Sequence, residues 1–229
     1  KSDAKMICSY AQNVALRLWT GDSKDQQECL QMTRILSVYT KQTTSLKNKI
    51  HGEEVLGVPS KLVLRSIKRS LKALQKEIKA IEKKVYELAK KEHQELLTLV
   101  ESIPGIGKKT SVMLVILTDG FERFTSASEL CSYAGITPVI RKSESSINRK
   151  PRISKIGNAK LRNLLFMCSF NACKYNKACK AIFDRIVAKG KSKKLALLAV
   201  CNKLLKQAFA VAKSRIPYDE NYRSTLVNN

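Results

Sequence analysis

"LRSIKRSLKALQKEIKAIEKKVYEL", residues 64–88, carries the most regular pattern in the chain. Its apolar residues recur alternately three and four positions apart, and Lys and Glu fill most other positions, which is typical of a coiled-coil seam. A single helix cannot bury such a stripe, so we expect pairing with a helix over residues 27–49, with a second copy of the chain, or with both. Packing within its own domain is the simpler alternative. The stripe consists of Leu64, Ile67, Leu71, Leu74, Ile78, Ile81, Val85 and Leu88.

Helical spacing continues on both sides of this stretch, and few alternating β-branched runs interrupt it. Ser126 and Glu129 form a capping box that opens a helix, which Gly135 and Pro138 close. The sequence therefore predicts a mainly all-α fold, with long coiled-coil helices beside a compact helical domain. Further helices are expected over residues 3–19, 127–134, 158–175, 177–189 and 192–213.

The charge of the chain points to a polyanionic partner. Its 43 basic and 19 acidic residues give a formal net charge of +24 over 229 residues, which favours nucleic acid. A merely soluble basic protein is the alternative. We find no apolar run of about 18 residues and no signal sequence, so we expect no membrane partner and a cytoplasmic location.

The seven cysteines form no CxxC pair and accompany only two histidines. Neither a zinc site nor a disulfide framework is indicated. Because most of them have apolar helical neighbours, we interpret them as small buried hydrophobic residues.

The stretch "LLTLVESIPGIGKKTSVMLVILTDG", residues 96–120, reads as a helix-hairpin-helix. Gly105 and Gly107 permit positive φ and close approach, so backbone amides can face a phosphate while Lys108 and Lys109 add charge. Alternatively, the glycines only allow two helices to pack tightly.

A second basic segment, residues 141–162, holds eight lysines and arginines against one acid, Glu144. Ser143 lies among them, and a serine becomes a useful nucleophile where cations stabilise its alkoxide and the charge developing on a phosphate. The alternative is a flexible loop that only grips the nucleic-acid backbone. The cations expected to clamp the phosphate are Arg141, Lys142, Arg149, Arg152, Lys155 and Arg162.

Two other patterns carry less chemistry. "KGKSKK", residues 189–194, contains Gly-Lys-Ser but lacks the earlier glycine and the preceding strand of a phosphate-binding loop, so we interpret it as a basic turn. A metal-dependent nuclease needs converging carboxylates, and only Asp3 is a candidate, since the other acids are scattered.

Three segments of the chain form a combined pattern. They are "SIPGIGKKTSVMLVILTDGFERFTSASELCSYAGITP" with the following "SESS", then "RISKIGNAKLRNLLF", and the late "AKGKSKKLALLAVCNKLL". Together, and in this order, they resemble the IS110 insertion-sequence family of transposases. The resemblance covers residues 96–218 approximately and identifies them with the C-terminal transposase domain of that family. The heptad helix resembles the family's coiled coil, and "KSDAKMI" resembles the end of its RuvC-like domain.

The resemblance implies a DNA recombinase, guided in characterised relatives by a noncoding bridge RNA. Ser143 matches the nucleophile, and Ser145 and Ser146 become supporting residues. The family also uses Mg²⁺ held by acidic residues, of which Asp3 alone has a counterpart here. Glu144 departs from the glycine that relatives often have. The implied domains are a RuvC-like remnant over 1–26, a coiled-coil region over 27–95 and the transposase domain over 96–229.

Because most of the family's acidic residues have no counterpart, we expect this chain to be a fragment of a larger enzyme. On that basis it should bind nucleic acid and form homo-oligomers through the coiled coil without completing transposition. The alternative function is a non-catalytic helix-hairpin-helix protein that assembles on nucleic acid. A nuclease working solely through metal ions ranks below both.

Overall fold

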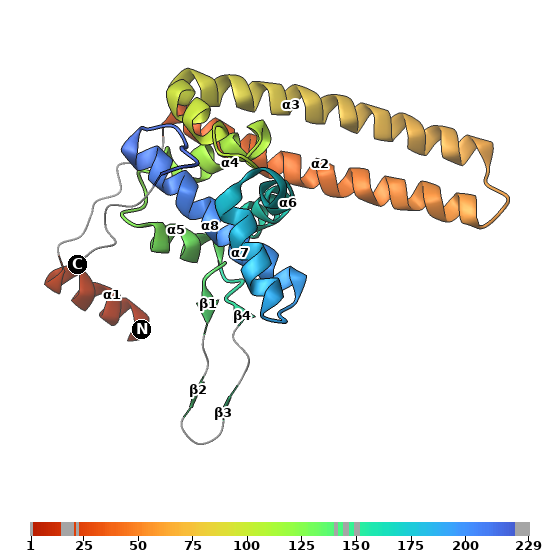
Figure 1. Cartoon of the computed structure of the whole chain (residues 1–229). Helices are drawn as coiled ribbons and strands as arrows, with labels where there is room; N and C mark the ends of the chain where they lie inside the picture. Colours follow the sequence, from red (N-terminus) through yellow and green to blue (C-terminus); the bar gives the residue numbers. More distant parts are fainter. Residues whose placement is uncertain are drawn as a thin grey trace.

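The computed structural model describes residues 2–14, 21, 23–139, 142–143, 147–148 and 152–222, with backbone only at 142, 143, 147, 148 and 152 (Figure 1). Helices dominate, which confirms the all-α prediction, and each described strand has only two residues. The helices are α1 Ser2–Asn13, α2 Lys24–Val55, α3 Lys61–Glu101, α4 Lys108–Thr118, α5 Ala127–Ala134, α6 Ala159–Tyr175, α7 Lys177–Ala188 and α8 Lys193–Ser214.

Helices α2 and α3 form a long hairpin that extends from the helical body (Figure 1). Ser23 caps α2 by accepting a hydrogen bond from the amide of Gln26, and Ser60 caps α3 in the same way through the amide of Val63. The prediction that the heptad helix pairs with the preceding helix is confirmed. The preceding helix is longer than expected, because it begins at Lys24 and continues to Val55.

Burial of the heptad stripe increases toward the base of this hairpin. Val85 and Leu88 are buried, whereas the stripe from Leu64 to Ile81 is only half-buried. Two helices cover each other along one line only, so the outer part of the stripe keeps contact with solvent. At the base, Cys29 of α2 joins Val85 and Leu88 in the same hydrophobic core as the C-terminal helices. Hence the core is continuous across residues 95 and 96, and the predicted domain limits stay a prediction.

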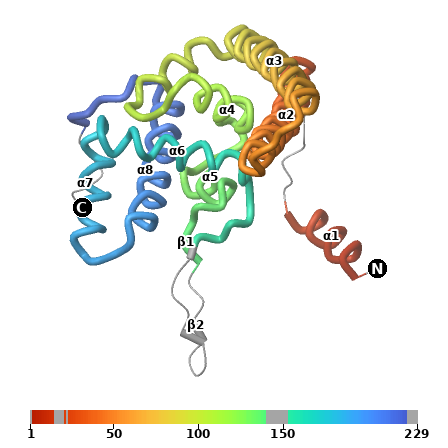
Figure 2. The backbone as a smooth tube through the Cα atoms, turned by 90° about the vertical axis from the view of Figure 1, so that its right-hand side faces the viewer, coloured from red at the N-terminus to blue at the C-terminus, as the bar shows by residue number. Residues whose placement is uncertain are grey.

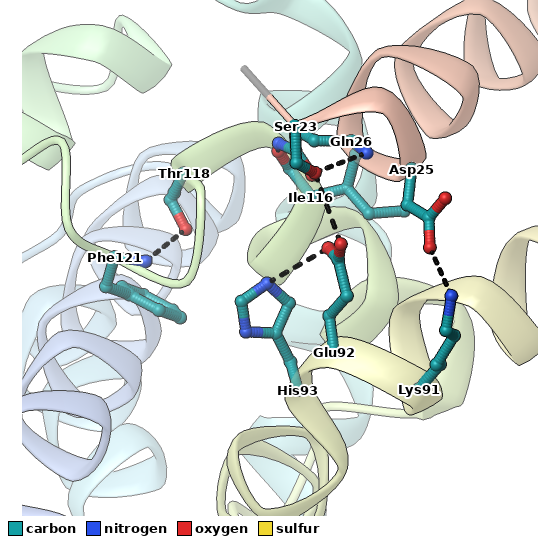
Figure 3. Close-up of polar contacts among 9 residues, drawn as sticks. All are labelled: Ser23, Asp25, Gln26, Lys91, Glu92, His93, Ile116, Thr118 and Phe121. Atoms are coloured by element: carbon teal, nitrogen blue, oxygen red, sulfur yellow. Dashed lines mark hydrogen bonds and ion pairs between the residues drawn. The ribbon is translucent and has the colours of Figure 1, made fainter. Parts of the chain in front are cut away.

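Polar contacts fix the base of the hairpin to α4 (Figure 3). The Nζ of Lys91 donates to Asp25 at 2.8 Å, and the hydroxyl of Ser23 donates to Glu92 at 3.2 Å. The buried side chain of Gln26 donates through Nε2 to the carbonyl of Ile116. The start of α2 is thereby joined to both α3 and α4.

Helix α3 bends at His93, whose φ of −135° and ψ of 37° are not helical. The bend lies beside Gly120, where an added Cβ would stand 3.1 Å from the imidazole. The helical spacing on either side of residue 93 does not predict this bend. It directs the last turns of α3 into the core, where Leu96 and Val100 are buried.

Helix α8 is the centre of the C-terminal part, with contacts to α3, α5, α6 and α7 (Figures 1 and 2). By length and composition it is apolar enough to cross a membrane, contrary to the expectation of no such segment. Half of its apolar window is buried against the other helices, however, which is the position of a core helix. Helix α1, in contrast, lies apart from the other helices and has no buried residue.

Helix boundaries in the C-terminal part agree with the prediction to within about one residue. Helix α5 spans the predicted range, and the Ser126 hydroxyl accepts from the amide of Glu129 at 3.2 Å. The Glu129 carboxylate accepts from the amide and hydroxyl of Thr125, which lowers its pKa. The first helix is shorter than predicted, because α1 ends at Asn13. Residues 15–20 lie outside the described part.

Most cysteines are buried, as expected, and all seven are free. Burial raises the pKa of Cys29 to about 11 and the pKa of Cys179 and Cys201 to about 12. These thiols therefore stay protonated at pH 8, and protonated thiols react slowly with alkylating reagents.

We expect Cys8, which is exposed, to be alkylated by iodoacetamide at pH 8 at least about tenfold faster than the buried thiols. Peptide mass spectrometry after timed quenching measures each rate, and denaturation in guanidinium provides the control in which all seven react alike. Rapid labelling of Cys201 in the folded protein would contradict the packing of α8.

Candidate nucleic-acid interface

Four short strands form an antiparallel hairpin between α5 and α6. β1 Pro138–Val139 pairs with β4 Arg152–Ile153, and β2 Lys142–Ser143 pairs with β3 Ile147–Asn148. Strands β2 and β3 lie farther from the helices than β1 and β4 (Figure 1). Ser143 is thus placed in β2, opposite Ile147.

Several predicted site residues belong to this hairpin. The structure gives the backbone of Lys142, Ser143 and Arg152 without describing their side chains. The remaining ones lie outside the described residues, so a cation cluster around the Ser143 hydroxyl stays a prediction. These remaining residues are Arg141, Ser145, Ser146 and Arg149.

Two glycines fix the base of the hairpin, where side chains would collide. Gly135 ends α5 with a φ of +69°, and a Cβ there would stand 2.6 Å from the carbonyl oxygen of Ile156. Gly157 has a φ of +128°, and its Cβ would stand 2.3 Å from the carbonyl oxygen of Tyr133. The amide of Asn158 donates to that same oxygen at 2.7 Å. The chain therefore enters and leaves the hairpin through a tightly packed crossing.

Among the cations predicted in residues 141–162, Lys155 and Arg162 have described side chains, and they differ in their contacts. The guanidinium of Arg162 donates from Nη1 to the carbonyl of Ala134 at 2.9 Å, so it also ties α6 to the end of α5. Lys155 is exposed, with a φ of +58°, and its amide donates to the carbonyl of Gly135 at 3.2 Å. Lys155 is the freer of the two for contact with an anion.

The Pro104–Gly107 turn separates the roles of its two glycines. At Gly105, with a φ of +105°, a Cβ would stand 2.7 Å from the Cβ of Ala172 in α6. At Gly107, which is exposed and opens α4 without a side-chain cap, an added Cβ would meet nothing within 4 Å. Gly105 therefore serves packing, and Gly107 leaves the start of α4 open to a ligand.

The two lysines that follow are also unequal. Lys109 forms an ion pair with Glu82 of α3, although its side chain remains 65% exposed. Lys108 is exposed and places its Nζ 6.0 Å from the ring centroid of Tyr86. Lys108 is thus the cation of this turn that has no acidic partner in the described residues.

The turn and the Ser143 hairpin contact different ends of α6. Gly105 packs on Ala172, and Gly135 packs beside Arg162, ten residues earlier. Ten residues of α-helix correspond to about 15 Å. The turn and the base of the Ser143 hairpin are therefore anchored at separate places on α6.

Asp3 belongs to no metal-binding group in the described part of the chain. It lies in the first turn of α1, where the Ser2 hydroxyl donates to it at 3.4 Å. Within the described residues, no group of three His, Cys, Asp or Glu side chains is arranged to bind a metal ion. Mg²⁺ therefore does not fit the described part of this chain.

The Gly-Lys-Ser turn has a structural role. Gly190 takes a φ of +69° between α7 and α8, and the Ser192 hydroxyl caps α8 by accepting from the amide of Leu195 at 3.3 Å. Since a helix precedes the turn, it is not a nucleotide-binding loop, in agreement with the prediction.

A groove that the sequence did not predict lies beside the base of the β1–β4 hairpin. It has a volume of about 1390 Å³ and is bounded by α5, α6, α7 and α8, so we call it the α5–α8 groove. Three different helices and one loop contribute its cations, which explains why spacing along the chain could not reveal it. These cations are Lys155, Arg162, Arg185, Lys194, Lys203 and Lys206.

The chain is similar to known transposition and inversion proteins. Residues 97–184 match the model of the Transposase IS116/IS110/IS902 family. Over 128 residues, 54% of this chain, it is 39% identical to a pilin gene-inverting protein of Moraxella lacunata. The corresponding protein of Moraxella bovis is 37% identical over 127 residues, again 54% of this chain. An insertion element IS110 protein of Streptomyces coelicolor is 28% identical over 128 residues, 56% of this chain.

These matches cover 38% of each Moraxella protein and 31% of the Streptomyces protein, so the chain spans well under half the length of these relatives. The matched region begins in the last turns of α3 and runs through the Pro104–Gly107 turn, the Ser143 hairpin and α6 into α7. Residues 97–184 therefore match the transposase domain of the IS116/IS110/IS902 family, in agreement with the resemblance seen in the sequence.

Proposed function

We propose that this chain is part of a DNA recombinase that cuts and rejoins DNA strands through Ser143. The supporting observation is the position of Ser143 in β2, on a hairpin held at its base by Gly135 and Gly157, within a domain of a transposase family. The tightly packed base holds the hairpin in place, and Ser143 lies beyond that base. This position suits a nucleophile that has to reach a phosphate on a large substrate.

The reaction would be a transesterification at phosphorus. The Oγ of Ser143 loses its proton and forms a bond to phosphorus, while the bond from phosphorus to the leaving strand oxygen breaks and that oxygen takes up a proton. One phosphate ester replaces another, so bond energy is conserved and the hydroxyl of a second strand can reverse the step. Arg141, Arg149 and Arg152 would neutralise the charge that builds on the phosphate.

The start of α4 would hold the DNA backbone away from the reacting bond. Gly107 leaves the first amides of α4 open, and Lys108 and Lys109 lie beside them on the surface. Such a contact positions the duplex without reading its sequence. A helix-hairpin-helix contact of this kind accounts for the lysines, since neither of them is buried.

Lys108→Gln is expected to make the negative slope of log K against log salt for duplex DNA shallower by about 0.9, because one phosphate contact is lost. Fluorescence anisotropy between 50 and 200 mM NaCl measures this slope. Lys41→Gln, at an exposed lysine near the middle of α2, is the matched control and should leave the slope within about 0.3 of the parent value. Equal slopes for the two variants would remove α4 from the interface.

The family resemblance supplies the remaining parts of the proposal. A guide RNA would share the basic surface with DNA in the cytoplasm, and Mg²⁺ would be held by carboxylates of a RuvC-like domain together with Asp3. A second copy of the chain would cover the half-buried stripe between Leu64 and Ile81, because exposed apolar seams of this kind associate.

The direct test of the proposed function is to trap a covalent protein–DNA adduct on a nicked substrate. The protein should carry the RuvC-like domain that the resemblance implies. The adduct should map to the peptide that contains Ser143.

A further inference from the structure

We infer that the α5–α8 groove binds an unpaired DNA strand, with bases on its floor and phosphates along its rim. This inference rests on the proposed function, because it names the segment of substrate held next to the Ser143 hairpin. It assigns the groove a role separate from the reacting bond.

Charge favours a polyanion as the occupant. Six lysines and arginines line the groove, and none of its described lining residues is acidic. Lys194, Lys203 and Lys206 follow one side along α8, while Arg162 and Arg185 come from α6 and α7. A groove lined by cations can follow the phosphates of a single strand.

The floor favours unpaired bases over a duplex. Apart from those cations, the lining is largely apolar, and it includes the half-buried Phe166, Ile182 and Leu198. A duplex offers phosphates to such a surface and keeps its bases stacked inside, whereas an unpaired strand can place bases on an aromatic ring. Asn163 and Asn202 supply amides that suit base edges.

The position of the groove favours DNA as the strand. Pro138 of β1 and Ile153 of β4, the first residue pair of the hairpin, both line it. A strand that leaves the groove at this end therefore runs toward β2 and Ser143. Cleavage of DNA at Ser143 would leave a strand end that has to separate from its complement before it can be joined to another strand, and the groove would hold that separated strand.

The test compares a 12-nucleotide single-stranded DNA with the duplex of the same sequence, by fluorescence anisotropy on the full chain. Phe166→Leu keeps an apolar side chain but removes the ring, and we expect single-strand binding to weaken about tenfold. Phe170→Leu is the matched control. It removes the same edge-to-face contact between the two rings, 5.4 Å apart, yet Phe170 does not line the groove.

The rim is tested by the double variant Lys194→Gln and Lys203→Gln. Loss of two phosphate contacts should make the negative salt slope for the single strand shallower by about 1.4. The duplex slope should stay within about 0.3 of the parent value. Lys41→Gln with Lys47→Gln removes the same charge from exposed positions on α2 and controls for the change in net charge.

If the variants lose affinity equally for the single strand and the duplex, the inference is overturned, because contacts to the nucleic-acid backbone alone would explain both losses. Unchanged single-strand binding would overturn it as well. The same variants are also tested with an RNA oligonucleotide of the same sequence. If they weaken RNA binding more than DNA binding, the occupant is RNA and the assignment to DNA is wrong. Ser143→Ala should bind the single strand normally, so failure of the groove and failure of the nucleophile are distinguishable.

Discussion

Replacing Ser143 by alanine is expected to reduce the covalent protein–DNA adduct at least about a thousandfold, since removal of a nucleophile costs this much in other covalent enzymes. Binding to the same DNA should stay within about a factor of two, because the cations and α4 remain. Denaturing gel electrophoresis of a labelled nicked substrate measures the adduct, and anisotropy measures binding. The protein is used together with the RuvC-like domain.

The matched control is Ser70→Ala, which removes a hydroxyl from an exposed position of α3. It should form the adduct at the parent rate. If the adduct persists in Ser143→Ala, another residue is the nucleophile. If the parent protein forms none, the non-catalytic helix-hairpin-helix protein becomes the better account, with the coiled coil as its means of assembly on nucleic acid.

The helices could be predicted because their signals are local. The spacing from Leu64 to Leu88 requires a helix with one apolar side, and α3 contains it. Ser126 with Glu129 gives the start of α5, and Gly135 gives its end through a φ of +69°. Hydrogen bonds within a few residues produce each of these features, so one sequence suffices to find them.

Features made by contacts distant in sequence could not be predicted. The carbonyl oxygen of Thr33 accepts from the Nζ of the half-buried Lys160 at 2.6 Å, which ties α2 to α6 across 127 positions. Burial lowers the pKa of Lys160, although the sequence shows it only as one more cation of a basic segment. The α5–α8 groove escaped prediction for the same reason, because its lining comes from elements that meet only in the folded chain.

The two glycines of the Pro104–Gly107 turn have different surroundings. Phosphate binding and tight packing are competing explanations of its glycines when only the sequence is considered. The structure assigns packing to Gly105, which lies against Ala172, and leaves Gly107 exposed at the start of α4. Packing therefore explains Gly105, and phosphate binding stays a proposal that concerns Gly107.

Gly105→Ala is expected to destabilise the fold by about 3 kcal/mol or more. Its φ of +105° is strained for any residue with a Cβ, and the new methyl would stand 2.7 Å from the Cβ and 2.9 Å from the Cα of Ala172. The closest atoms belong to the rigid α6 backbone and to a side chain with no rotamers, so neither can turn away. Urea denaturation followed by circular dichroism gives the free energy of unfolding.

Gly107→Ala is the control in the same turn. Its φ of −99° is ordinary and its Cβ would meet open space, so the free energy of unfolding should fall by no more than about 1 kcal/mol, the cost of a poorer N-cap. If both variants unfold alike, the packing of this turn against α6 is wrong. If Gly107→Ala keeps its stability but binds duplex DNA several-fold more weakly, the methyl has obstructed the open start of α4, and the phosphate site lies where the second glycine leaves room for it.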